Sequence, residues 1–282
     1  MKILVLGDSH TAAVKYGWDA IAGDHRGKRL EFFALPKRRM NRLKAQGGRL
    51  MMAERAVDGD KRRFEAAFGA ESVEAGAYDA ILLVGLLETG HTLIAANART
   101  LLPDQAAPAP RGGGLLRLAR RRSAPAPAPV ARGTRAMFAA AFDCVFEASV
   151  ARSVLRQMAK LGGPPCHWAR NPLISAAVLT SDHALRPAFE AALARGDAAR
   201  MLEIAEDRAR AQLPGHVALI AQPARTIHRG CMTETGYMSG ARTFYDRGQT
   251  FGRNDILHAN GAYGALLLEA VFAAQGAREG VA

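Results

Sequence analysis

The apolar run Ile3-Leu4-Val5-Leu6, which ends at Gly7, constrains the fold of this chain more than any other feature of the sequence. A continuous apolar run of this length is typical of a strand that is buried on both faces of a parallel sheet. Similar runs recur at Leu30 to Leu35, Ala80 to Gly85, Cys166 to Ala169 and Val217 to Gln222. Helical spacing between the runs predicts an α/β fold, a three-layer α/β/α domain with a parallel sheet of about five strands.

Three segments have clear helical spacing. An Ala-rich stretch from Thr11 to Ile21 follows the first strand directly, and a longer stretch runs from Phe189 to Gln212. A closing helix is predicted from about Ala262 to Ala274. Because 282 residues suffice for one sizeable core, we expect a single domain over residues 1–282.

Residues 104–132, which are rich in Ala, Pro and Arg, interrupt this rhythm. Between Asp104 and Asp143 the chain has seven arginines and no acidic residue, and these arginines supply seven of its twelve net positive charges. Such a composition buries little apolar surface, so it predicts a disordered or flap-like insertion. Because the charge is local, we do not expect nucleic-acid binding. The insertion either has no binding role or binds an acidic ligand or surface.

The amino-terminal residues and the cysteines indicate the compartment. Only a four-residue apolar run precedes Gly7 and Asp8, far shorter than a signal-peptide core or a membrane span requires. Cys144, Cys166 and Cys231 are odd in number and form no C-x-x-C pair, which disfavours a disulfide framework and a zinc site. We therefore expect a cytoplasmic protein without a transmembrane segment.

The segment Gly7-Asp8-Ser9-His10 joins the first strand to the first helix. A serine at such a turn exposes its hydroxyl at the carboxyl edge of the sheet, where backbone N–H groups near the helix N-terminus can face a developing oxyanion. Taken alone, Asp and Ser here are also ordinary helix N-caps. A nucleophilic role for Ser9 therefore needs a base.

Asp255 and His258 supply that base before the closing helix. Their spacing of three residues lets the carboxylate orient the imidazole, as an acyl-transfer triad requires. A D-x-x-H pair alone is also consistent with a polar pair at the surface. The two segments together predict a Ser-His-Asp site, because both lie at the same edge of the predicted sheet.

At these two blocks the sequence resembles the SGNH hydrolase family, also called GDSL-like esterases. Gly7-Asp8-Ser9 matches the first block, with His10 where the family name has leucine, and Asp255-x-x-His258 matches the last. The resemblance implies a flavodoxin-like parallel sheet. It also implies that Ser9 is the nucleophile and donates its N–H to the oxyanion hole, that His258 is the general base, and that Asp255 orients His258.

The middle blocks of the family fit less well. For the glycine that donates a second N–H to the oxyanion hole, Gly48 after the second strand is the candidate, although a plain loop glycine fits equally. The third block normally reads Gly-x-Asn-Asp, whereas Leu87 stands here in place of the asparagine. One such donor is worth roughly 3 kcal/mol in hydrolases. The candidate substitutes are Asn171, His91 and Thr89.

Other residues near these blocks are candidates for substrate binding. Asp8, His10 and Asn171 flank the predicted site, and His10 either touches the substrate or packs at the helix start. Five basic residues follow the second strand and form either a solvated loop or a site for phosphate, sulfate or carboxylate: Lys37, Arg38, Arg39, Arg42 and Lys44. Cys231, with Glu234 nearby, lacks the strand-to-helix turn that a nucleophile needs.

Hydrolysis of a small or carbohydrate-linked ester through an acyl-Ser9 intermediate is the function that these features favour. An O-acyltransferase of a glycan pathway and a non-catalytic binding module of the same fold remain alternatives. The expected partner is a small-molecule or glycan ester, and an anionic ligand can bind at the basic loops. We expect neither a metal nor an organic cofactor, and the sequence does not determine the oligomeric state.

Overall fold

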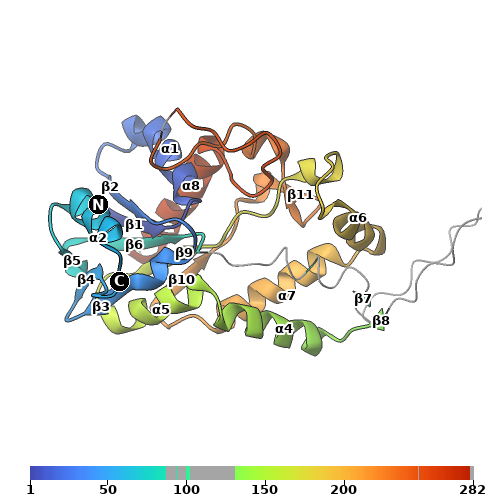
Figure 1. Cartoon of the computed structure of the whole chain (residues 1–282), viewed down its shortest axis with the longest axis horizontal. Helices are drawn as coiled ribbons and strands as arrows, with labels where there is room; N and C mark the ends of the chain where they lie inside the picture. The colour runs from blue at the N-terminus through green and yellow to red at the C-terminus, as the bar shows by residue number, and fades with distance from the viewer. Residues whose placement is uncertain (87–93, 95–99, 102–130, 247, 280–282) are drawn as a thin grey trace, which may run out of the picture.

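A five-stranded parallel sheet forms the centre of the protein (Figure 1). The computed structural model describes residues 1–86, 94, 100–101, 131–246 and 248–279. The sheet has the order β10-β9-β6-β1-β2. Its strands are β1 (Lys2–Gly7), β2 (Arg29–Ala34), β6 (Ala80–Val84), β9 (Cys166–Ala169) and β10 (Val217–Ile220). All five predicted strands are confirmed, and the strand order is the doubly wound, flavodoxin-like one.

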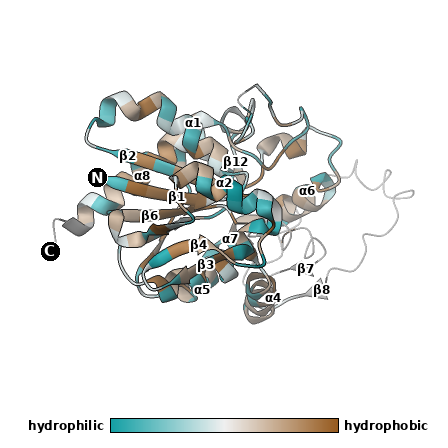
Figure 2. Cartoon of the chain, turned by 60° about the vertical axis from the view of Figure 1, so that its left-hand side comes forward, coloured by the Kyte–Doolittle hydropathy of each residue, from teal (hydrophilic) through white to brown (hydrophobic). Residues whose placement is uncertain are grey.

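Alternate residues of the central strands face opposite layers of the domain. Ile3 and Val5 of β1 pack with α1 (Thr11–Ile21) and α8 (Gly261–Glu279), whereas Leu4 and Leu6 belong to the core cluster on the other face. The hydrophobic colouring of β1 and β6 shows why both faces need a helical cover (Figure 2). The uninterrupted apolar runs therefore have the physical origin that the sequence predicts.

Helices cover both faces of this sheet. The helices α1 and α8 pack together on one face (Figure 1). The helices that contribute to the core cluster of Leu4 and Leu6 are α2 (Asp58–Phe68), α4 (Arg135–Glu147), α5 (Val150–Leu161), α6 (Arg186–Arg195) and α7 (Ala198–Ala211). The helix predicted over residues 189–212 is in fact two. Gly196 takes a left-handed φ of 81° and caps α6, so the chain turns before α7.

A small antiparallel sheet follows β2. It consists of β3 (Leu43–Gln46), β4 (Arg49–Met52) and β5 (Ser72–Glu74). The short strands β11 (Ile227–His228) and β12 (Met232–Thr233) form a separate antiparallel pair. The part of the chain that the structure describes also contains the 3-10 turns η1 (Ala22–His25), η2 (Lys37–Arg42), η3 (Ala75–Ala77), η5 (Ala176–Leu179), η6 (Ala224–Thr226) and η7 (Thr235–Tyr237).

Most of the predicted insertion, residues 104–130, lies outside the described residues. Its last two residues form β8 (Ala131–Arg132), which pairs in parallel with β7 (Thr100–Leu101). The end of the segment therefore has regular backbone structure, and α4 begins three residues later. The single-domain boundaries and the disorder of residues 104–132 stay predictions.

Candidate active site

Ser9 lies in the tight connection between β1 and α1, at the carboxyl edge of the sheet. Gly7 makes this turn possible, because a Cβ there would overlap Thr11 Oγ1 and the carbonyl oxygen of Val84. The carbonyl of Ser9 accepts a hydrogen bond from Ala12 N (3.3 Å). In the described part of the chain the Ser9 N–H has no such partner. Both the hydroxyl and a backbone donor of Ser9 are thus available at this edge.

Asp8 ties this turn to the turn after β6. Its carboxylate accepts hydrogen bonds from His10 N (3.1 Å) and from Leu86 N (2.9 Å), and the residue is completely buried. Gly85 has a φ of 72° and Leu86 a φ of 77°, and a Cβ at Gly85 would lie 3.1 Å from Asp8 Cγ. A leucine in the left-handed region is strained, and such strain persists only where surrounding contacts enforce it. Asp8 is therefore a structural clamp.

The segment from Phe251 to Asn260 carries the other two polar side chains and is anchored at its middle and at its carboxyl end. Ser175 N donates to the carbonyl of the buried Ile256 (2.8 Å). The Asn260 side chain donates to the carbonyls of Gly236 (2.8 Å) and Ser239 (2.9 Å) and accepts from the first N–H groups of α8. Because Asn260 caps α8 as well, it links the loop to the helix that packs against α1.

Ser9, His258 and Asp255 form one hydrogen-bonded chain. The Ser9 Oγ lies 2.9 Å from His258 Nε2. Asp255 Oδ1 and Oδ2 lie 3.1 and 3.0 Å from His258 Nδ1. Because a carboxylate only accepts, Nδ1–H donates to Asp255, which leaves Nε2 to accept the Ser9 proton.

Asp255 keeps its negative charge in this environment. Burial alone would raise its pKa, but the imidazole of His258 and the N–H groups of His258 and Leu257 lower the pKa of Asp255 below its ordinary value. The two N–H groups lie 3.1 and 3.3 Å from the carboxylate oxygens. A carboxylate held in this way orients the imidazole and stabilises the imidazolium ion that forms when Ser9 loses its proton.

The His258 ring is held between two other rings. Phe251 stacks on it with a centroid separation of 3.6 Å and an interplanar angle of 4°, and His10 stacks on it at 4.8 Å and 21°. His10 in turn contacts Asn171, whose Nδ2 lies 2.9 Å from His10 Nε2. An amide nitrogen donates, so the Asn171 side chain as oriented here donates to Nε2 of His10. The two stacked rings fix the plane of His258.

A cavity of about 280 Å³ opens beside Ser9. Its walls are largely apolar and come from the end of β2 and from the segment before His258; they comprise Asp8, Ser9, Ala34, Leu35, Pro36, Thr243, Phe244, Tyr245, Asp246, Gln249 and Phe251. The hydroxyl of Tyr245 donates to the carbonyl of Ala34. The cavity can take a small apolar group next to the Ser9 hydroxyl.

Gly48 is not part of this site, contrary to the prediction. With Gly47 it forms the two-residue turn between β3 and β4, and its carbonyl accepts from Ala75 N (2.9 Å). Ala75 precedes β6, and Asp79 N donates to Lys2 O (2.8 Å), so this region lies toward the amino edge of the sheet. Ser9 lies at the opposite edge. The chain reverses after β2, and the reversal carries Gly48 away from Ser9.

Asp8 and His10, two predicted substrate contacts, have structural contacts in the site, and their role in substrate binding stays a prediction. Asp8 is completely buried and its carboxylate accepts from backbone N–H groups, while the residue also borders the cavity beside Ser9. His10 is only 7% exposed and packs on His258. Leu87, Thr89 and His91 lie outside the described residues.

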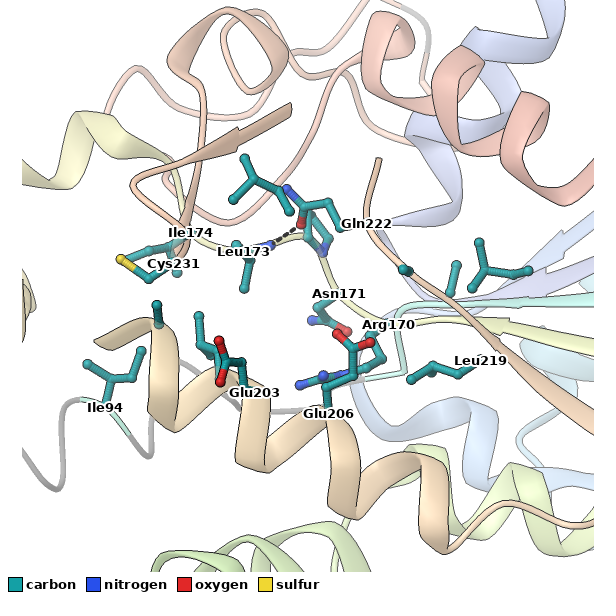
Figure 3. A pocket seen from close by; sticks show the side chains of 18 of the residues that line it. Ile94, Arg170, Asn171, Leu173, Ile174, Glu203, Glu206, Leu219, Gln222 and Cys231 are labelled. Carbon is teal, nitrogen blue, oxygen red and sulfur yellow. Dashed lines mark hydrogen bonds between the residues drawn. The ribbon is translucent and has the colours of Figure 1, made fainter. Parts of the chain in front are cut away.

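Asn171 borders a second cavity, of about 230 Å³, at the carboxyl ends of β9 and β10. Figure 3 shows Asn171 and Arg170 near Glu206 of α7, and the hydrogen bond from Leu173 N to Gln222 (2.9 Å). The cavity beside Ser9 is not lined by Asn171, which reaches the site through His10.

Cys231 also lines the second cavity, and burial raises the pKa of its thiol to about 11. Its predicted neighbour Glu234 is 2.9 Å from His228. A thiol of such high pKa carries little of the thiolate that acts as a nucleophile.

The sequence analysis missed two contributors to the site, Phe251 and the bond between Asn171 and His10. Neither spacing nor composition marked Phe251 as a partner of His258. The described residues include no cluster of three His, Cys, Asp or Glu side chains able to hold a metal ion. None of the helices within those residues has the length and apolar character needed to cross a membrane.

Comparisons with known proteins do not define a family for this chain. No protein-family model matches the sequence. The search of curated proteins also found no match. Among solved structures, the chain is similar to a lipase/acylhydrolase from Enterococcus faecalis, with 14% sequence identity, a TM-score of 0.36, and coverage of 98% of this chain and 96% of that one.

Proposed function

We propose that the protein is a serine hydrolase that cleaves a small ester through an acyl-Ser9 intermediate. The observation that carries the proposal is the hydrogen-bonded chain of Ser9 Oγ, His258 and Asp255, with 2.9 Å between Oγ and Nε2. The 280 Å³ cavity beside Ser9 supports a small acyl or alcohol group, as in deacetylation or deacylation of a small or carbohydrate-linked ester.

In the first half of the reaction Ser9 Oγ attacks the ester carbonyl carbon while His258 Nε2 takes the hydroxyl proton. The Ser9 N–H donates to the oxygen that becomes negative, and Asp255 stabilises the imidazolium. His258 then returns the proton to the leaving alkoxide, so an alcohol departs and the acyl group stays on Ser9. In the second half His258 takes a proton from water, whose oxygen attacks the acyl carbon, and the carboxylic acid leaves as Oγ regains its proton.

The test pairs chemical labelling with turnover. A fluorophosphonate probe should label the wild-type protein at Ser9, as read by mass spectrometry, and should not label Ser9→Ala. A series of p-nitrophenyl esters of increasing acyl length should be hydrolysed by the wild type, best at short chains. Absence of both labelling and turnover in folded wild-type protein would contradict the proposal.

A further inference from the structure

Three arginines surround one buried carboxylate close to the Ser9 cavity. Arg39, Arg42 and Arg63 lie 3.1, 3.4 and 3.7 Å from the oxygens of Asp60. The Asp60 side chain is 0% exposed, whereas the arginine side chains are 47%, 34% and 45% exposed. One carboxylate cannot neutralise three guanidinium groups. This group of three arginines, here called the arginine cluster, therefore presents uncompensated positive charge to the solvent.

Tyr245 connects the arginine cluster to the cavity. The guanidinium carbon of Arg63 lies 5.1 Å from the centroid of the Tyr245 ring, and Tyr245 lines the cavity together with Ser9. The hydroxyl of Tyr245 donates to the carbonyl of Ala34, which pairs in register with Gly7, two residues before Ser9. The Tyr245 ring therefore lies between Arg63 and the edge of the sheet that carries Ser9.

Phe244, a second aromatic residue of the cavity wall, also has a cation over its ring. The Lys15 Nζ lies 4.6 Å from the centroid of the Phe244 ring, and Phe244 also lines the cavity. Exposed carboxylates also lie near these cations, among them Asp246 on the cavity wall and Asp19, one helical turn from Lys15 on α1. Arg39, Arg42 and Arg63 nevertheless share the single carboxylate of Asp60, which gives their side of the cavity a positive potential.

Guanidinium groups match carboxylate, sulfate and phosphate oxygens in geometry and in charge. We propose that the arginine cluster binds an anionic group of the substrate while the apolar cavity holds the part next to the ester bond. The inference rests on the proposed function and narrows its substrates to esters whose acyl or alcohol half carries a carboxylate, sulfate or phosphate. The salt bridges to Asp60 hold the guanidinium groups in place for this role.

The test uses aryl esters that differ in charge. The neutral substrate is p-nitrophenyl acetate, the ester with an anionic acyl half is mono-p-nitrophenyl succinate, and the ester with an anionic alcohol half is 5-acetoxy-2-nitrobenzoate. The wild type should prefer one of the anionic esters in kcat/KM. Arg63→Gln should reduce kcat/KM for that ester by roughly tenfold or more, because hydrogen bonds to charged groups are stronger than those between neutral groups. The kcat/KM of the variant for the neutral ester should stay within about twofold of the wild-type value.

The matched control is Arg62→Gln, the same charge change at the exposed neighbour on α2, which should leave the preference unchanged. A high salt concentration should reduce the wild-type preference. Thermal unfolding of both variants checks that Asp60 keeps enough partners for folding; if Arg63→Gln fails to fold, Arg39→Gln replaces it in every measurement.

Binding to Ser9→Ala separates this inference from the proposed function, because no turnover is needed. In calorimetric titration the anionic ester should bind Ser9→Ala more tightly than p-nitrophenyl acetate, and adding Arg63→Gln should remove the difference. Equal affinities would overturn the arginine-cluster inference whether or not the protein hydrolyses esters. Tighter anionic binding in a wild type that hydrolyses no ester would instead refute the proposed function alone.

Discussion

Replacing Gly264 by alanine tests whether the contact between α1 and α8 holds Ser9 and His258 at hydrogen-bond distance. A Cβ at Gly264 would overlap the carbonyl group of Ala13 and lie 2.8 Å from Val14 N. These are backbone atoms of α1, so no side-chain rotation relieves the overlap. The two helices would have to separate by about 1 Å, which a close-packed interior does not absorb.

The expected magnitude follows from two opposing effects. Gly to Ala in a helix interior contributes up to about 1 kcal/mol of stability. Overpacking against a fixed backbone costs about 1–3 kcal/mol, so Gly264→Ala should be destabilised overall. Gly276, on the same helix, is the matched control, because a Cβ there has no neighbour within 4 Å. Because the propensity gain is common to both variants, their melting temperatures should differ by the overpacking cost alone, roughly 2–9 °C in a domain of this size.

The assay combines thermal unfolding, followed by circular dichroism, with the rate of fluorophosphonate labelling at Ser9. Gly264→Ala should label more slowly than the wild type even below its melting transition, because a shift of α8 displaces His258 from the 2.9 Å contact with Ser9. Gly276→Ala should label at the wild-type rate. A Gly264→Ala protein that melts and labels like Gly276→Ala would refute the role of this helix contact.

Further predictions concern residues of the site, the pH dependence of stability and the reactivity of the cysteines. His10→Ala and Asn171→Ala should each lower kcat with little change in KM, and the double variant should be no worse than His10→Ala alone, because Asn171 acts through His10; additive losses in a double-mutant cycle would contradict this. Asp255→Asn should lower kcat by on the order of 10⁴-fold. The folded protein depresses the pKa of Asp255, so the wild type should be more stable than Asp255→Asn at pH values above the ordinary aspartate pKa of about 4. This advantage should shrink as the pH falls through the lowered pKa. Urea unfolding at several pH values measures it, and an advantage that is unchanged in acid would refute the linkage. At pH 8 iodoacetamide should alkylate the exposed Cys144 and spare the buried Cys231 in native protein, as peptide mass mapping can show.

The sheet could be predicted from the sequence because each of its strands is a short apolar run that is buried on both faces. That pattern is local, so it can be recognised without knowledge of the fold. The same holds for α1, which begins and ends at the predicted residues Thr11 and Ile21. The break between α6 and α7 was missed because the apolar spacing continues across Gly196, whose left-handed backbone ends the first helix.

The candidate triad could also be proposed from the sequence, because parallel strands bring their carboxyl ends to one edge and both motifs follow strand or loop ends there. The direction of the chain after β2 could not be predicted in this way. The chain reverses through the β3–β4 hairpin, and this reversal takes Gly48 to the amino edge. Order along the chain does not reveal such a reversal, since it depends on how the small sheet packs against α2 and α5.

The surroundings of the site were decided only by tertiary structure. Phe251 and His10 reach His258 from a loop and from a helix start, and Arg63 reaches Tyr245 from α2 across almost two hundred residues of sequence. The sequence by itself determined the sheet, the bounds of α1 and the residues proposed for the Ser-His-Asp chain, which depend on local patterns. It also determined the start of the closing helix, but that helix ends at Glu279 and not at the predicted Ala274. Contacts between side chains of distant segments depend on the path of loops and on close helix packing, and neither leaves a periodic signal in the sequence.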